Sequence, residues 1–191
     1  MLFIYVILIQ NHNTMTLNFS SLKIALFALL IFSCSSNDDG NSNSQVFGTI
    51  QLSGSDTSSV GNTLVVGNID TEAFNTTGTY SSVVLMDENT TIENGELVLT
   101  DFSNGFVMVA ARFHDEDDAI VDQAISMTIL SNGEEFRYGC TTPPTNATNN
   151  IYCGTGLIVD KIGKRVVFDD TTVINLDSGA ILTMNGTINY N

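Results

Sequence analysis

A succession of short β-type runs is the feature that most limits how this chain can fold. From Val46 onward, runs rich in Val, Ile, Thr, Phe and Tyr are separated by clusters of Gly, Asn, Asp and Ser. No stretch has the period of an amphipathic helix. The alternation is clearest over 125–140, where two runs with apolar residues at every second position flank the turn Ser131-Asn132-Gly133. This pattern predicts a hairpin with one buried face and one solvent-exposed face.

About ten or eleven such runs follow one another, with turn signals at the spacing typical of all-β domains. We expect strands at 46–52, 63–66, 80–86, 96–100, 106–113, 125–129, 136–140, 157–159, 166–168, 172–174 and 180–190. We therefore predict an antiparallel β-sandwich of about ten strands, with a β-barrel as the alternative. The tripeptide Gly-Thr-Ile occurs at 48–50 and again at 186–188, but the flanking residues do not align. We do not interpret it as an internal repeat.

Residues 22–40 predict export. Lys23 precedes about nine apolar residues that end at Ser33 and Cys34, which is the layout of a secretory signal peptide. The run is too short for a membrane-spanning helix, which needs roughly 20 residues. We expect residues 1–33 to be the signal peptide. A second apolar patch at 2–9 precedes it, so that translation starting at Met15 would leave residues 1–14 outside the working protein.

The order Ile31-Phe32-Ser33-Cys34 resembles the lipobox of bacterial lipoproteins, and residues 35–40, Ser-Ser-Asn-Asp-Asp-Gly, resemble the export signal of surface lipoproteins of the Bacteroidota. The general pattern of 167–187 is also similar to small flavobacterial lipoproteins of uncharacterised function. The resemblance implies that Cys34 is acylated and that the protein is anchored to the outer membrane, facing the cell exterior. Alternatives are an ordinary signal peptide with an unrelated Cys34, and a generic acidic tether.

The resulting organisation is a lipidated, flexible linker over 34–45 and a single β domain over 46–191. Removal of residues 1–33 leaves 158 of the 191 residues, enough for one domain with a real core. The removed segment holds one of the six cations and none of the 21 acids, so the formal net charge changes from −15 to −16. Nucleic acid and anionic lipid are therefore poor partners, because the cations are scattered apart from Lys161, Lys164 and Arg165. Divalent cations are electrostatically favoured.

Cysteine usage agrees with export. If lipid occupies Cys34, then Cys140 and Cys153 remain as a pair in a compartment that permits disulfides, and we expect them to be bonded. Closing so short a loop would stabilise the domain by about 3 kcal/mol on the chain-entropy estimate. A zinc site is the alternative, but two cysteines with no histidine nearby are too few ligands for a closed tetrahedral site.

A dense acidic cluster lies between two expected strands. It begins at His114 and contains the candidate calcium ligands Asp115, Glu116, Asp117, Asp118 and Asp122. Calcium takes six to eight oxygen ligands, and a carboxylate-rich turn can supply several of them. The spacing does not match a defined calcium loop. The alternative is a solvated turn without metal, and calcium is the only cofactor that the sequence suggests.

Catalysis finds little support in the sequence. His114 is the only histidine after residue 33, there is no Gly-x-Ser-x-Gly elbow, and the two other cysteines are expected to be oxidised. We therefore expect no catalytic residues and no enzyme. A hydrolase that uses two carboxylates is the least favoured alternative, because any acidic protein offers such pairs. The favoured function is a non-catalytic binding or structural role at the cell surface, with a glycan or an outer-membrane protein as the partner.

Two further residues are candidate sites. The chain has no tryptophan, so a sugar-stacking platform would have to come from tyrosine, and Tyr152 beside the expected disulfide loop is the exposed candidate. Tyr138 and Tyr190 are expected to pack in the core. The triplet Asp170-Thr171-Thr172 resembles the acceptor pattern for O-glycosylation in the Bacteroidota, which implies a sugar on Thr171. The alternative is a chance occurrence of a short pattern.

Overall fold

Strands make up more than half of the chain that the computed structural model describes, which is residues 46–72, 82–113 and 121–191. All of these residues belong to one compact unit. The strands are β1 (Gly48–Gly54), β2 (Thr63–Val66), β3 (Asn68–Asp70), β4 (Val83–Met86), β5 (Thr90–Glu93), β6 (Glu96–Leu99), β7 (Gly105–Arg112), β8 (Gln123–Ser131), β9 (Glu134–Thr142), β10 (Ile158–Asp160), β11 (Arg165–Asn175) and β12 (Ile181–Asn189). A short helix, α1 (Thr57–Val60), and a 3₁₀ turn, η2 (Asn146–Thr148), complete the fold.

The prediction of an antiparallel all-β domain is confirmed. Ten strands form one sheet, in the order β2-β1-β12-β11-β9-β8-β7-β4-β3 with β10 paired to β11, and β5 and β6 form a separate hairpin. Most neighbours in the sheet are consecutive strands of the chain, as in an up-and-down arrangement. The first and last strands, β1 and β12, also pair with each other.

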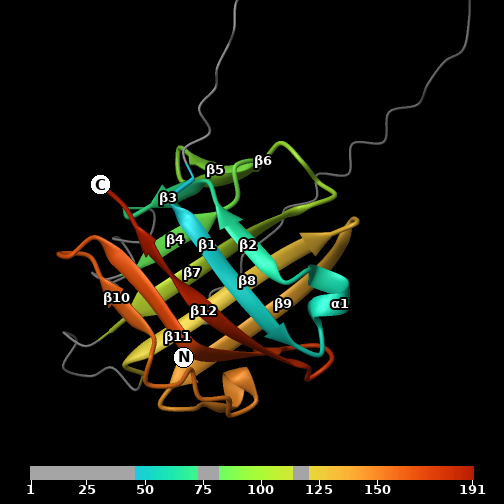
Figure 1. The fold of residues 1–191 in the computed structure, drawn as a ribbon, viewed down its shortest axis with the longest axis vertical. Helices are drawn as coiled ribbons and strands as arrows, with labels where there is room; N and C mark the ends of the chain where they lie inside the picture. Colours follow the sequence, from blue (N-terminus) through green and yellow to red (C-terminus); the bar gives the residue numbers. More distant parts are fainter. Residues whose placement is uncertain (1–45, 73–81, 114–120) are drawn as a thin grey trace, which may run out of the picture. The chain divides into compact units, whose positions relative to one another are not determined.

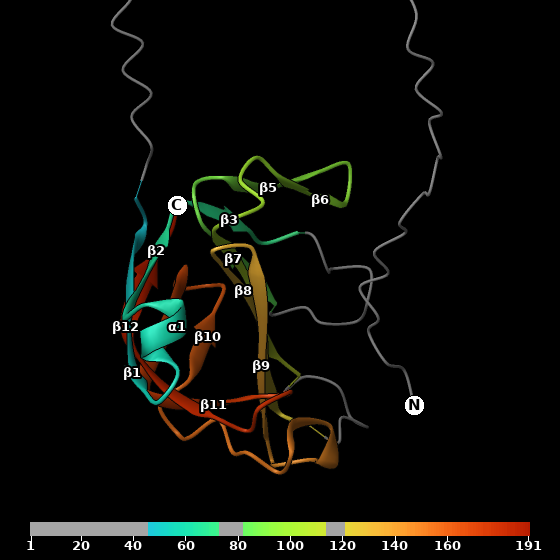
Figure 2. The same cartoon turned by 90° about the vertical axis from the view of Figure 1, so that its right-hand side faces the viewer.

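The sheet is nearly closed on itself. Its two edge strands, β2 and β3, are separated in the chain only by Gly67, so the backbone itself passes from one edge to the other. The Gly67 N–H donates to the Met86 carbonyl at 3.0 Å. A Cβ on Gly67 would lie 2.7 Å from the backbone of Glu88, so a glycine permits this close approach. Figure 2 shows β1, β2 and β12 on one side of this flattened barrel and β7, β8 and β9 on the other.

The space enclosed by the strands is filled by one apolar cluster. Alternate residues of each long strand point into it, which the period of two in the sequence predicts. Its largest fully buried members include Tyr138, Phe168, Ile50, Leu85, Met108, Ile125, Met127, Leu157, Leu182, Met184 and Ile188. The expected core position of Tyr138 is confirmed, and Tyr190 is partly buried against the same cluster.

Several connections meet at one end of the barrel, which we call the helix end because α1 lies there (Figure 1). The Ser131 hydroxyl donates to the Ser59 carbonyl at 2.7 Å. The Asn132 N–H donates to the Asn104 side chain at 3.1 Å, and the Gly133 N–H donates to the Ser103 carbonyl at 2.8 Å. The connections β1–β2, β6–β7 and β8–β9 are therefore bonded to one another.

The strand boundaries differ from the prediction in two ways. The runs 166–168 and 172–174 belong to one strand, β11, because the polar residues Asp169 and Asp170 form a β-bulge inside it and do not end it. Strands β3 and β5 and the helix α1 were not anticipated. Each is only three or four residues long, which is too short for a periodic pattern to show.

Candidate functional site

The most elaborate part of the fold is the end of the barrel opposite α1, where β1 begins and β12 ends. A segment that we call the strap, residues 151–160, lies here between β9 and β11. On one edge, the Thr141 N–H of β9 donates to the Ile151 carbonyl at 3.2 Å. On the other edge, β10 pairs with β11 from Ile158↔Val167 to Asp160↔Arg165. We call this end of the barrel the strapped end.

The strap completes a part of the sheet that β9 and β11 leave open. These two strands pair directly only at Ile174↔Gly139 and Asn175↔Tyr138. Farther along β11, the Thr172 N–H donates to the Cys153 carbonyl at 3.1 Å, and the Asp169 N–H donates to the Gly156 carbonyl at 3.2 Å. The strap thus supplies backbone acceptors that β9 does not reach.

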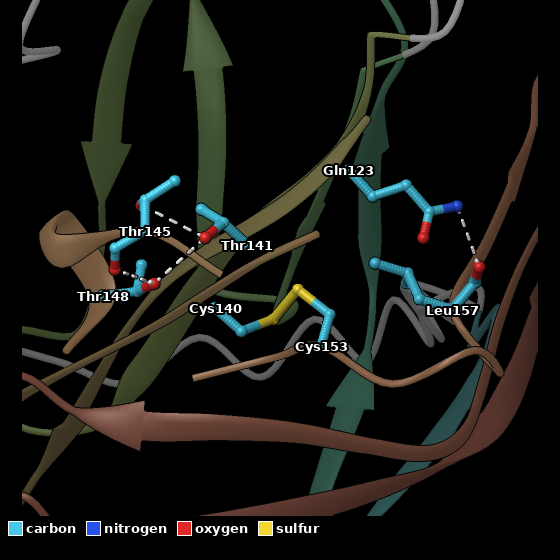
Figure 3. The surroundings of a disulfide bond; sticks show 7 residues. All are labelled: Gln123, Cys140, Thr141, Thr145, Thr148, Cys153 and Leu157. Carbon is cyan, nitrogen blue, oxygen red and sulfur yellow. Dashed lines mark hydrogen bonds between the residues drawn. A yellow bond between two sulfur atoms is a disulfide. The ribbon is translucent and has the colours of Figure 1, made fainter. Parts of the chain in front are cut away.

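The predicted disulfide between Cys140 and Cys153 is confirmed, and it fastens the strap to β9 (Figure 3). Both cysteines are completely buried members of the apolar core. The Gln123 side chain of β8 donates from Nε2 to the Leu157 carbonyl at 3.0 Å, which holds the strap at a second point. Leu157 and Val159 are each only 1% exposed, so the strap also contributes to the core.

A threonine cluster supports the loop between β9 and the strap. The Thr141 hydroxyl donates to the Thr145 hydroxyl at 3.2 Å and shares a hydrogen bond of 3.2 Å with the hydroxyl of Thr148 (Figure 3). The Thr148 hydroxyl lies 3.3 Å from the Thr145 carbonyl and donates to it. Because these hydroxyls bond one another, the cluster ties the loop to the end of β9.

The bulge in β11 is fixed by a side chain from β12. Asp170 has φ +48°, in the left-handed region that few residues other than glycine, asparagine and aspartate adopt. Its N–H donates to the Asn185 side-chain oxygen at 2.9 Å, and Asn185 Nδ2 donates to an Asp170 carboxylate oxygen at 3.1 Å. Asn185 therefore replaces the ladder bonds that the bulge interrupts.

The structure places Thr171, the expected glycosylation residue, inside the barrel. It is 0% exposed, and its hydroxyl oxygen is buried without a hydrogen-bond partner. The residue before it forms the bulge, and this shift points the Thr171 side chain into the core. A sugar on this hydroxyl cannot be accommodated in the folded domain, so burial argues against the predicted modification.

The other candidate residues are less fully described. Tyr152 is 43% exposed at the start of the strap, in agreement with the expected exposure of this ring. Asp115, Glu116, Asp117 and Asp118 lie outside the described residues. Asp122 is exposed, and its backbone bonds Phe113 and Thr142. Among the described residues, no group of three or more His, Cys, Asp or Glu could hold a metal ion. Calcium binding stays a prediction, and Cys34 also lies outside the described chain.

A largely buried polar group that no sequence pattern indicates lies at the helix end. The Tyr138 hydroxyl donates to the Asp56 carboxylate at 2.8 Å, and Asn175 Nδ2 donates to the same oxygen at 3.1 Å. Burial, together with the hydrogen bond to Asp56, raises the pKa of Tyr138 well above its ordinary value. These residues are 82 and 119 positions from Asp56 in the chain, so only the fold brings them together.

Among the described residues, no helix combines the length and apolar character needed to cross a membrane. The chain matches no protein-family model, no curated protein and no solved structure. Functional inference therefore depends on the residues and contacts described above.

Proposed function

We propose that this chain is an exported lipoprotein, held at the outer membrane by lipid on Cys34, whose β domain has a non-catalytic binding or structural role at the cell surface. The observation that carries the proposal is the buried disulfide between Cys140 and Cys153. Structural disulfides form in oxidising compartments and are rare in the cytosol. In this proposal, the signal-like segment that precedes Cys34 directs the export.

The non-catalytic part of the proposal is supported by how the polar side chains are used. Asp56, Tyr138 and Asn175 bond one another. Asp170 and Asn185 fix the bulge, and Gln123 holds the strap. A catalytic group needs a polar atom that can reach a substrate. In the described chain these side chains instead hold the fold together.

The anchoring is tested by the mature N-terminus. Intact mass of the native protein is expected to show cleavage before Cys34 and the added mass of acyl chains. A Cys34→Ser variant is expected to lose the acyl mass and to leave the membrane fraction, while the folded domain keeps its disulfide. Surface exposure is tested separately by protease treatment of intact cells. A native N-terminus other than residue 34 would overturn the proposal.

A glycan is the second candidate partner, favoured by the exposed ring of Tyr152. Aromatic rings are the usual apolar contact for the faces of sugars, and Tyr138 is buried and already bonded to Asp56. A glycan array with the wild-type protein is expected to show binding that Tyr152→Ala removes and that Tyr152→Phe keeps. Phe102, 76% exposed on the β6–β7 connection, supplies the matched control, because Phe102→Ala changes an exposed ring elsewhere.

A further inference from the structure

The turn between β10 and β11 is the most exposed apolar feature of the described chain. Ile162, at its tip, is 98% exposed, and Ile158, at the start of the same hairpin, is 41% exposed. A single exposed apolar residue is ordinary on a protein surface. Here, however, the exposed isoleucine is flanked in the sequence by Lys161, Lys164 and Arg165 in a strongly acidic protein.

The turn is held rigidly. The Asp160 carboxylate accepts a hydrogen bond from the Gly163 N–H at 2.7 Å and lies 3.4 Å from Arg165 Nε. Lys161 Nζ donates to the Thr71 carbonyl at 2.7 Å, and the Lys164 carbonyl accepts from the Tyr190 N–H at 3.0 Å. Both sides of the turn are therefore bonded to neighbouring elements, and the Ile162 side chain is displayed on a fixed support.

The cations of the protein gather at this end of the barrel. Of the five Lys and Arg residues after residue 33, two are in the turn and a third, Arg165, is the first residue of β11. Arg112, at the end of β7, also lies at the strapped end, and only Arg137 lies toward the other end, where it pairs with Asp177 at 2.6 Å. Acids are present nearby as well, including Asp70, Glu72 and Asp122, so the positive potential is local to the turn.

The tether joins the domain at the same end of the barrel as this turn. The described chain begins at Val46, two residues before β1, and β1 begins at the strapped end where β12 ends. Between Cys34 and Val46 lie 12 residue steps, which span at most about 40 Å when fully extended. A lipid on Cys34 would therefore hold the start of β1, and with it the strapped end, within about 40 Å of the bilayer.

We propose that the β10–β11 turn docks on the anionic lipid surface to which the protein is tethered, with Ile162 inserted among the head groups and Lys164 beside lipid phosphate. This inference rests on the lipid anchor proposed above. The overall negative charge predicts repulsion from such a surface, but salt screens charges beyond about 8 Å, so the cations nearest the bilayer dominate. Exposed apolar side chains and neighbouring cations both favour binding to an anionic membrane surface.

The experiment uses the absence of tryptophan from the chain. Ile162→Trp in the full-length acylated protein places a single fluorophore at the tip, and Ile181→Trp, at a site 44% exposed near the helix end, is the matched control. Each is reconstituted into vesicles of phosphatidylcholine with or without phosphatidylglycerol. We expect a blue shift and several-fold stronger quenching by brominated lipid for the Ile162→Trp protein than for the control, in the anionic vesicles. Adding Lys164→Glu is expected to reverse most of the shift.

The outcomes separate this inference from the lipid anchor. A protein that is acylated and sediments with vesicles, but whose Ile162→Trp emission stays that of an aqueous tryptophan, overturns the docking and leaves the anchor intact. If intact mass shows no acylation, the anchor fails, and the same fluorescence measurement with added vesicles still decides whether the turn binds lipid. A blue shift that needs no vesicles and grows with protein concentration would assign the tip to a second copy of the chain and overturn the inference.

Discussion

The Asp56 carboxylate accepts hydrogen bonds from Tyr138 and Asn175, and the environment of the Tyr138 phenol predicts how stability depends on pH. The phenol is 1% exposed and donates to Asp56, and both its burial and this bond raise its pKa. The folded domain therefore holds this proton more tightly than the unfolded chain, whose tyrosines titrate near pH 10. The corresponding part of the free energy of unfolding is fully present below about pH 10 and is lost as the pH rises through the raised pKa.

We predict that the free energy of unfolding, measured by urea denaturation, falls steeply above about pH 10 and that Tyr138→Phe makes this fall shallower. The same variant is expected to cost about 1 kcal/mol at neutral pH, because Asp56 loses a donor. Tyr152→Phe is the control, since it removes an exposed hydroxyl without a buried partner. An alkaline slope in Tyr138→Phe as steep as that of the wild type would contradict the prediction.

The positions of Gly48 and Gly186 explain why the tripeptide Gly-Thr-Ile occurs near both ends of the domain. The register of β1 with β12, Gln51↔Asn185, places the two Gly-Thr-Ile segments against each other when it is continued by three residues. A Cβ on Gly186 would lie 2.5 Å from the Thr49 carbonyl oxygen, and one on Gly48 would lie 2.9 Å from Ile188 Cδ1. The two copies of the tripeptide therefore lie opposite each other, one in β1 and one in β12, in a single antiparallel pairing.

This contact predicts a ranking of glycine substitutions. Gly186→Ala should destabilise most, by roughly 1–3 kcal/mol, because its new methyl group meets backbone that cannot move aside. Gly48→Ala should cost less, since the end of the Ile188 side chain can rotate away and the nearest backbone atom, the Thr187 carbonyl oxygen, is 3.0 Å distant. Gly105→Ala is the control, because its Cβ would lie 3.4 Å from the nearest atom, an ordinary contact. Equal thermal midpoints for Gly186→Ala and Gly105→Ala would refute the ranking.

The strap shows how far the sequence could predict the fold. Alternation identified β8 and β9, and the cysteine pair correctly gave the disulfide, since both depend on local pattern or simple counting. The bonds of the strap to β11 could not be foreseen, because Cys153 and Gly156 serve there as backbone acceptors, which no side-chain pattern marks. The same holds for Asp56 and Asn175, whose meeting depends on closure of the barrel. The inward position of Thr171 could not be foreseen either, because one bulge residue reverses which side chains face inward.

The disulfide should stabilise the strap more than the rest of the sheet. The Cys140→Ala, Cys153→Ala double variant is expected to lose about 3 kcal/mol of the free energy of unfolding, from the added entropy of the unfolded chain. Hydrogen exchange should become fastest at the Asp169 and Thr172 N–H groups, whose acceptors belong to the strap. Gln123→Ala is a milder control that removes one strap bond and keeps the disulfide. If hydrogen exchange in the double variant were accelerated equally across β8 and β9, the effect of the disulfide would not be local to the strap.

Closure of the barrel depends on pairing between the first and last strands of the domain. β12 pairs with β1 on one side and with β11 on the other, and it contributes Leu182, Met184 and Ile188 to the core. Without β12, two strands would expose unpaired backbone groups and the apolar interior would open to water. Because β1 and β12 lie more than a hundred residues apart in the chain, their pairing carries a large loop-closure cost and should form late in folding.

We predict that a chain ending at Gly179 does not fold cooperatively, whereas a chain lacking only residues 190 and 191 does. Far-ultraviolet circular dichroism during thermal unfolding and resistance to proteolysis measure the difference. A synthetic peptide of residues 180–191 added in trans should restore protection of the shorter chain, because β12 needs only its two neighbours and the core to bind. Cooperative unfolding of the chain ending at Gly179 without the peptide would show that the other strands close without β12, and closure would then not depend on the C-terminal strand.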